Sequence, residues 1–184
     1  DGGNNDLPFF KPDLHIVIAD PLRPGHELTY YPGEVNVRLA DVVIVNKVDS
    51  ARKEDVETVI RNVRSINDHA RIIKANSVIS VENPELIKRK RVLVVEDGPT
   101  LTHGGMAFGA GTVAAKKFEA LEIIDPRPYA VGSIRTVFHD FPHIGALLPA
   151  MGYSREQVKE LEDTINASDC DAVIAGTPID LGGL

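Results

Sequence analysis

Short apolar runs, separated by polar and glycine-rich segments, dominate the hydrophobic pattern of the chain. The runs are rich in β-branched residues and are nearly continuous rather than alternating, which indicates strands buried on both faces. They span residues 14–20, 41–45, 71–75, 91–96, 123–125 and 171–176.

Helical periodicity fills much of the sequence between these runs. Within residues 50–70, apolar side chains recur at helical spacing: Val56, Val59, Ile60, Val63 and Ile66. A capping-box pair, Ser154 and Gln157, opens a second predicted helix over residues 154–166, and shorter helices are predicted over 34–39, 83–87 and from Thr112 onward. This alternation predicts an α/β doubly wound fold, a mostly parallel sheet with helices on both faces, built as one compact domain over residues 1–184.

Polar residues follow the predicted strands, and ligands in such folds lie at the carboxyl ends of the strands. After the second run comes N-K-V-D, with Asn46, Lys47 and Asp49. A carboxylate at Asp49 can accept two hydrogen bonds from guanine, while the stem of Lys47 can lie along a base. The alternative is a strand end at which Asp49 or Ser50 caps the next helix, and both interpretations can hold together.

The next predicted strand ends in A-N-S, residues Ala75, Asn76 and Ser77. Backbone N–H groups of such a loop can contact the oxygen of a base, and its position after N-K-V-D favours that interpretation over a simple polar turn. The sequence therefore predicts a nucleotide-binding edge formed by these two loops.

A glycine-rich loop, E-D-G-P-T-L-T-H-G-G-M-A-F-G-A-G, follows the fourth run. Its glycines permit close approach of the backbone to an anion, and the helix after it favours a phosphate. We expect Thr102 and His103 to be catalytic and the remaining residues to hold phosphate: Gly98, Thr100, Gly104, Gly105, Gly109 and Gly111. A mobile surface loop is the alternative, and the G-x-x-x-x-G-K-[ST] phosphate loop is absent because the chain contains no Gly-Lys pair.

Two further segments carry candidate chemistry. Arg23 and His26, in R-P-G-H-E, could bind an anionic substrate, although a Pro-Gly turn with solvated side chains is the simpler interpretation of that segment alone. Asp1, in the opening D-G-G-N-N-D, could reach a magnesium ion, with a flexible terminus as the alternative.

Charge and cysteine content narrow the function classes. The net charge of −7 disfavours nonspecific binding to nucleic acid or to an anionic membrane. The single cysteine, Cys170, cannot form an internal disulfide, which favours a reducing cytoplasm. Because the chain does not open with Met, we expect it to be a fragment of a longer protein.

Several long motifs make the chain resemble cyclic 2,3-diphosphoglycerate synthetase and its relatives, predicted P-loop GTPases. They are D-G-G-N-N-D-L-P-F-F-K-P-D, D-P-L-R-P-G-H-E-L-T-Y-Y-P-G-E-V-N, V-N-K-V-D, V-E-D-G-P-T-L-T-H-G-G-M, F-P-H-I-G-A-L-L-P-A-M-G-Y and G-T-P-I-D-L. The resemblance implies a P-loop NTPase-like fold, with the phosphate loop upstream of residue 1, Asp1 on the magnesium side, and a base-reading role for Asn46, Lys47 and Asp49.

The activity implied by the resemblance is an NTP-dependent ligase that forms an intramolecular phosphoanhydride in 2,3-diphosphoglycerate, with ATP or GTP and Mg²⁺. The alternative is a regulatory GTPase that binds GTP and hydrolyses it slowly. The partners we expect are a small anionic phosphorylated substrate and, optionally, a second copy of the chain, but neither nucleic acid nor a membrane.

Overall fold

The computed structural model describes residues 7–151 and 154–178. Its contacts divide the chain into two compact units, residues 1–78 and 79–184, where the sequence pattern suggested one compact domain. Each unit is a mixed α/β structure with its own parallel sheet and its own hydrophobic core. No helix in the described part of the chain combines the length and apolar character needed to span a membrane.

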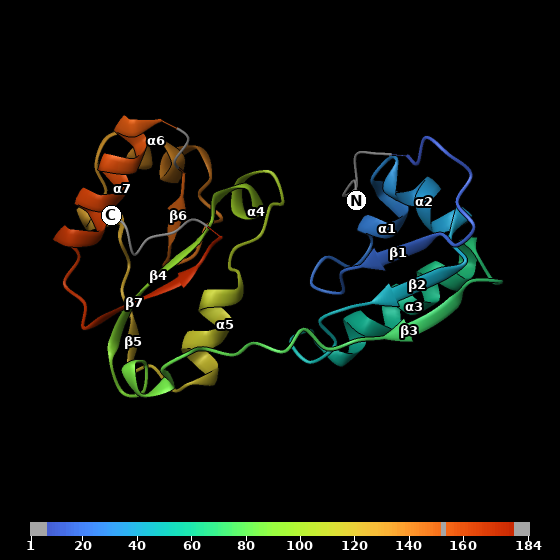
Figure 1. Cartoon of the computed structure of the whole chain (residues 1–184), viewed down its shortest axis with the longest axis horizontal. Helices are drawn as coiled ribbons and strands as arrows, with labels where there is room; N and C mark the ends of the chain where they lie inside the picture. The colour runs from blue at the N-terminus through green and yellow to red at the C-terminus, as the bar shows by residue number, and fades with distance from the viewer. Residues whose placement is uncertain (1–6, 152–153, 179–184) are drawn as a thin grey trace. The chain divides into compact units, whose positions relative to one another are not determined.

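The first unit is built on a three-stranded parallel sheet in the order β1-β2-β3 (Figure 1). Its strands are β1 (Ile16–Ala19), β2 (Val42–Val45) and β3 (Arg71–Lys74), which confirms three of the predicted apolar runs. The connecting helices are α1 (His26–Thr29), α2 (Gly33–Leu39) and α3 (Lys53–Ile66). In the pairing register, Val17 lies beside Val43 and Val43 beside Ile72, so the carboxyl ends of the strands meet at one edge.

The core of this unit lies on one face of its sheet. Val43 and Val45 of β2 are fully buried, as are Val59 and Val63 of α3. The other face carries Ile16 and Ile18, which are 50% and 66% exposed, and among the described residues of this unit no helix packs on it. The reason is topological, because successive right-handed crossovers that move across a sheet in one direction place all their helices on the same face.

The second unit is built around β4 (Arg91–Asp97), whose residues 92–96 are buried. β7 (Ala172–Gly176) pairs along one edge of β4, while β5 (Glu122–Ile123) and β6 (Leu148–Ala150) pair with the start and end of the other edge. All three pairings are parallel, which confirms the predicted strand direction.

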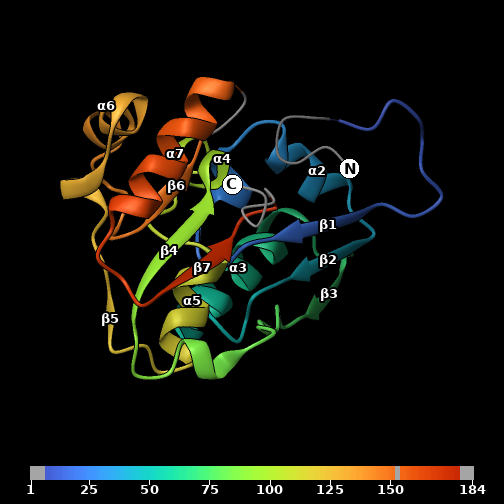
Figure 2. The same ribbon diagram turned by 60° about the vertical axis from the view of Figure 1, so that its left-hand side comes forward.

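Helices lie on both faces of the second sheet. α5 (Ala110–Lys117) contacts β4 and β7 on one face, whereas α6 (Gly132–Asp140) and α7 (Arg155–Ala167) lie toward the other (Figures 1 and 2). Shorter elements are α4 (Gly98–Thr102) and the 3-10 segments η1 (Pro84–Leu86) and η2 (Arg127–Tyr129). The predicted capping box is present, because the hydroxyl of Ser154 accepts from the amide of Gln157 and the Gln157 side chain accepts from Ser154 N–H.

Candidate functional site

The carboxyl edge of the first sheet brings the two predicted base-binding loops together. The amide of Val48, in the loop after β2, donates to the carbonyl of Ala75 at the end of β3, with an N–O distance of 3.2 Å. The amide of Ser77 donates to the carboxylate of Asp49 at 3.1 Å. The backbone amide of Asn46 donates to the carbonyl of Ala19 at the end of β1, with an N–O distance of 3.0 Å. The two loops therefore lie together at one edge of the sheet, where the sequence pattern placed them.

Asp49 is exposed at this edge. A carboxylate offers about four lone-pair positions. The bond from Ser77 uses one of them, so the group retains the capacity to accept the paired donors of a guanine. The helix-capping alternative is not what the structure shows, because α3 begins at Lys53 and its N-cap residue is Arg52.

Asp20, which follows β1, is a further charged residue at this edge, and no role was predicted for it. Its carboxylate oxygen Oδ2 accepts from the ammonium of Lys47 at 2.8 Å and from the guanidinium of Arg23 at 3.3 Å. The other oxygen, Oδ1, accepts from the amide of Leu22 at 3.0 Å. A strand-end aspartate followed by proline was the signal in the sequence, but its partners come from two different loops.

The electrostatics of Asp20 follow from these contacts. Burial acts to raise the pKa of the carboxyl group, and the hydrogen bonds from Lys47 and Leu22, with the charges of Lys47 and Arg23, outweigh it. The pKa of Asp20 therefore lies below its ordinary value, and the group is an anion at neutral pH.

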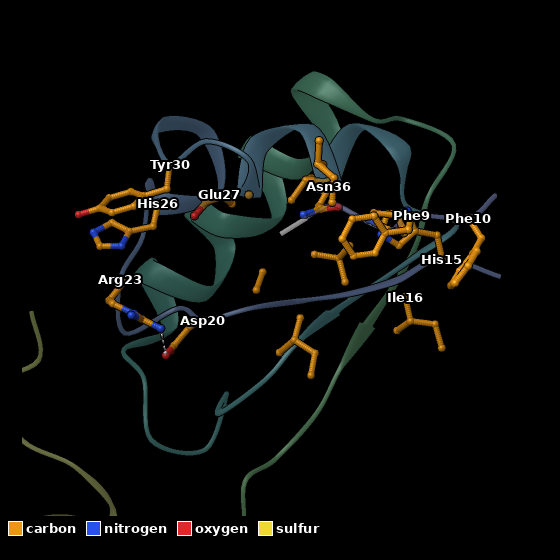
Figure 3. Close-up of a pocket in the computed structure, with 17 residues that line it drawn as sticks. Phe9, Phe10, His15, Ile16, Asp20, Arg23, His26, Glu27, Tyr30 and Asn36 are labelled. Carbon is orange, nitrogen blue, oxygen red and sulfur yellow. Dashed lines mark hydrogen bonds and ion pairs between the residues drawn. The ribbon is translucent and has the colours of Figure 1, made fainter. Parts of the chain in front are cut away.

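Arg23 and His26 line a depression of about 850 Å³ between β1 and the helices α1 and α2. The imidazole of His26 stacks on the ring of Tyr30, with centroids 4.3 Å apart (Figure 3). At the other end of the depression lie Phe9 and Phe10. The predicted turn is present, and Arg23 and His26 are partly buried beside it, so the anion-binding role of these two residues stays a prediction.

Buried polar contacts hold this segment in shape. Glu27 is 7% exposed, and its carboxylate accepts from the amide of Gly25 and from the side chain of Asn62, the latter at 2.6 Å. Desolvation, followed by the nearby charge of Arg23, lowers the pKa of His26, although the carboxylates of Glu27 and Asp20 oppose this shift. The imidazole is consequently neutral at neutral pH, and Arg23 provides a cationic donor fork beside it.

The glycine-rich loop of the second unit is occupied by internal carboxylates. Glu96, 1% exposed, accepts from the amides of Gly109 at 3.0 Å, Gly111 at 3.2 Å and Thr112 at 2.7 Å, and from the Thr112 hydroxyl at 3.0 Å. Asp97 accepts from the amide of Thr100 at 3.2 Å and from its hydroxyl at 2.8 Å. These groups were expected to hold phosphate, so that part of the prediction loses its support.

The other glycines of this loop serve packing and turns. A Cβ at Gly98 would lie 2.6 Å from the carbonyl oxygen of Ala150, and one at Gly104 would lie 2.4 Å from that of Thr100. Gly105 adopts a left-handed conformation, with φ of 62°. The loop is therefore closely packed on the chain itself rather than open to an anion.

Thr102 and His103, predicted to be catalytic, do lie in contact. The Thr102 hydroxyl donates to the carbonyl of Gly98 at 3.0 Å and lies 3.1 Å from Nδ1 of the exposed His103 ring. Since that hydroxyl already donates its proton, it can accept one from His103. Nothing in this pair identifies a substrate, and its catalytic role stays a prediction.

Asp1, the predicted magnesium ligand, lies outside the described residues. Within residues 7–151 and 154–178, no group of three or more His, Cys, Asp or Glu side chains is placed to hold a metal ion.

Fold and site together describe a mixed α/β protein with polar and charged side chains gathered at the carboxyl edge of the parallel sheet in its first unit. No protein-family model matches the chain. The chain is 63% identical over 181 residues to a protein of Thermococcus kodakarensis named "Arginine synthetase ArcE", and this match covers 98% of the chain. The chain spans only 40% of that relative's length. The relative's name is that of an enzyme, and it does not confirm the cyclic 2,3-diphosphoglycerate synthetase suggested by the motifs.

Proposed function

We propose that the chain is part of an NTP-dependent ligase and that its first unit carries the base-binding edge. The observation that carries the proposal is the hydrogen bond between Asp49 and the amide of Ser77, which joins the two predicted base-binding loops. The 63% identity to a protein named a synthetase supports the reaction class.

The proposed chemistry is phosphoryl activation of a small acceptor. An oxygen of the acceptor attacks the γ-phosphorus of the nucleotide, the bond to the bridging oxygen breaks, and the nucleoside diphosphate leaves. If the product is arginine, as the relative's name suggests, the activated oxygen is bonded to carbon. An amine nitrogen then forms the new C–N bond while phosphate departs. If the acceptor is 2,3-diphosphoglycerate, an oxygen of its second phosphate attacks the phosphorus of the activated phosphate. The ring closes as the transferred γ-phosphoryl group departs as inorganic phosphate.

Each residue group has a proposed role in this reaction. Asp49 selects the base, and the aliphatic stem of Lys47 supports the base. Arg23 and His26 bind an anionic group of the acceptor, which both candidate acceptors carry. Catalysis of this kind depends on positioning and on neutralising the charge of the transferred phosphoryl group. Magnesium, with Asp1 as a proposed ligand, would supply part of that neutralisation.

The base-binding role is tested by thermal denaturation of the complete protein with Mg²⁺ and either GTP or ATP. A nucleotide at 100 times its Kd stabilises a protein by about 2.7 kcal/mol, so binding is readily visible. We expect Asp49→Asn to lose this stabilisation for the preferred nucleotide much more than for the other. Asp68→Asn is the matched control, because Asp68 is 77% exposed and precedes β3 at the opposite edge of the sheet. Equal losses for both nucleotides would refute the role given to Asp49.

The acceptor is tested on the same protein by phosphorus and nitrogen NMR. One reaction contains 2,3-diphosphoglycerate and the other contains a ureido analogue of arginine with ammonium. A cyclic phosphoanhydride in the first would support the 2,3-diphosphoglycerate ligase, whereas arginine in the second would support an activity like that named for the relative. GTP hydrolysis with neither product would favour the regulatory GTPase instead.

A further inference from the structure

The carboxylate of Asp20 is shared by two loops that have different proposed roles. Its oxygen Oδ2 accepts from Lys47, in the base-binding loop after β2, at 2.8 Å, and from Arg23, in the acceptor-binding loop after β1, at 3.3 Å. The Asp20 side chain is 14% exposed, so water screens these contacts only weakly. One anion is therefore the common partner of both cations.

The two contacts with Asp20 differ in strength. The Lys47 contact is short and joins side chains 27 residues apart, whereas the Arg23 contact is long and involves one guanidinium nitrogen. A guanidinium binds a phosphate or carboxylate best through two parallel hydrogen bonds, which Asp20 does not provide here. An anionic group on the acceptor can consequently draw Arg23 away from Asp20.

The backbone of Lys47 shows that its position is tightly set. Lys47 adopts a left-handed conformation, with φ of 56°, which a residue other than glycine occupies only when its surroundings hold it there. Its carbonyl accepts from the amides of Ser50 and Ala51, each at 3.0 Å. With the backbone fixed, the position of the aliphatic stem of Lys47 depends on how firmly Asp20 holds the ammonium.

We propose that Asp20 is a positioning residue that couples acceptor binding to nucleotide binding. This inference rests on the proposed function of the two loops. When an anionic group binds Arg23, its charge offsets the repulsion between Arg23 and Lys47, and Oδ2 of Asp20 becomes available to Lys47 alone. Lys47 is then held more firmly for the base, so the acceptor tightens nucleotide binding, and by reciprocity the nucleotide tightens acceptor binding.

The experiment measures the Kd of a non-hydrolysable GTP or ATP analogue with Mg²⁺ on the complete protein, by calorimetry. The nucleotide analogue is titrated without any second ligand, with saturating 2,3-diphosphoglycerate, and with saturating L-arginine. The phosphates of the first probe and the carboxylate of the second are the two sources of the anion. We expect one of these probes to lower the Kd about fivefold, at the small end of typical allosteric couplings. In Asp20→Asn, which keeps the size of the side chain, the ratio of the two Kd values should fall to about one.

Two further variants keep the test decisive. Arg23→Gln leaves Oδ2 of Asp20 to Lys47 alone, so it should lower the Kd of the nucleotide without acceptor toward the value that the acceptor produces in the wild type, and it should bring the ratio close to one. This variant replaces Asp20→Asn if Asp20→Asn does not fold. Glu57→Gln removes the exposed ion pair between Lys74 and Glu57 in the same unit and should keep the wild-type ratio. A purely structural role for Asp20 would lower stability without changing the ratio.

The outcomes separate this inference from the proposed function. If the wild-type protein binds nucleotide but neither probe changes its Kd, the coupling is refuted and the base-binding edge stands. If Asp20→Asn keeps the wild-type ratio, Asp20 is not the coupling residue. If the wild-type protein binds no nucleotide, the proposed function fails and the inference fails with it.

Discussion

Replacing Glu96 should destabilise the second unit more than any surface change in it. The buried carboxylate accepts four hydrogen bonds, three from backbone amides at the start of α5 and one from the hydroxyl of Thr112. The approach is close, because a Cβ at Gly109 or at Gly176 would lie 2.4 or 2.5 Å from Glu96 Oε2. Glu96→Ala leaves all four donors without this acceptor.

The size of the loss follows from opposing contributions. A hydrogen bond to a charged group contributes about 1.5–3 kcal/mol, and four such bonds do not add fully. Removing the carboxylate also relieves the cost of burying a charge, which is several kcal/mol. We expect a net loss of about 3 kcal/mol for Glu96→Ala. Glu96→Gln should lose about 2 kcal/mol, because its oxygen can still serve Gly109 and Thr112 while its nitrogen cannot accept from Gly111.

Hydrogen exchange measured by mass spectrometry tests this locally, and urea denaturation followed by circular dichroism tests it globally. A loss of about 3 kcal/mol corresponds to exchange about 100-fold faster in residues 109–117. Glu122→Gln is the matched control, because Glu122 is 58% exposed and accepts from Arg91 at the surface. In this variant, residues 109–117 should exchange their amide hydrogens at the wild-type rate. A loss under about 0.5 kcal/mol for Glu96→Ala would place it among ordinary surface substitutions and refute the reasoning.

Three further outcomes are expected, each with its own measurement. The pKa of Asp20 is lowered in the folded state, so its ionised form stabilises the protein at pH values above the ordinary pKa of 3.8. This stabilisation is lost as the pH falls through the lowered pKa. The free energies of unfolding of the wild type and of Asp20→Asn, measured in acid titrations, should therefore converge at low pH. Asn67→Ala should cost about 2–4 kcal/mol in urea denaturation, because the buried Asn67 side chain donates to the carbonyls of Val37 and Ala40 and accepts from the amide of Ala70. Ser154→Ala should cost about 1 kcal/mol in the same assay through loss of the cap of α7, and an unchanged midpoint would contradict the capping role.

Elements with strong local signals were predictable from the sequence. The valines of β2 and β4 and the helical spacing of Val56, Val59 and Val63 gave the right element type, with boundaries off by a few residues. β6 was missed because it has three residues and contains Pro149, and α6 was missed because it begins at Gly132, which adopts a φ of 50°. Their formation depends on packing against β4 and α7, which no local pattern records.

The sequence predicted which loops form the candidate site, but it did not predict which side chains contact one another there. Strand ends in a parallel sheet meet at one edge, so Asp49 and Ser77 could be placed together from their positions alone. The sharing of Asp20 between Lys47 and Arg23 depends on side-chain reach across the sheet and could not be read from spacing. Glycine density suggested an open anion site, whereas the glycines at 109 and 176 make room for the carboxylate of Glu96.

The left-handed backbone of Lys47 has a consequence for engineering this protein. Glycine adopts that conformation without steric cost, so a search for stabilising substitutions would favour Lys47→Gly on backbone grounds. The same substitution removes the ammonium that binds Asp20 and the stem proposed to support the base. Position 47 is therefore a point where relief of backbone strain is opposed by the loss of the ion pair with Asp20 and of ligand affinity, and a variant intended to remain active should retain the lysine.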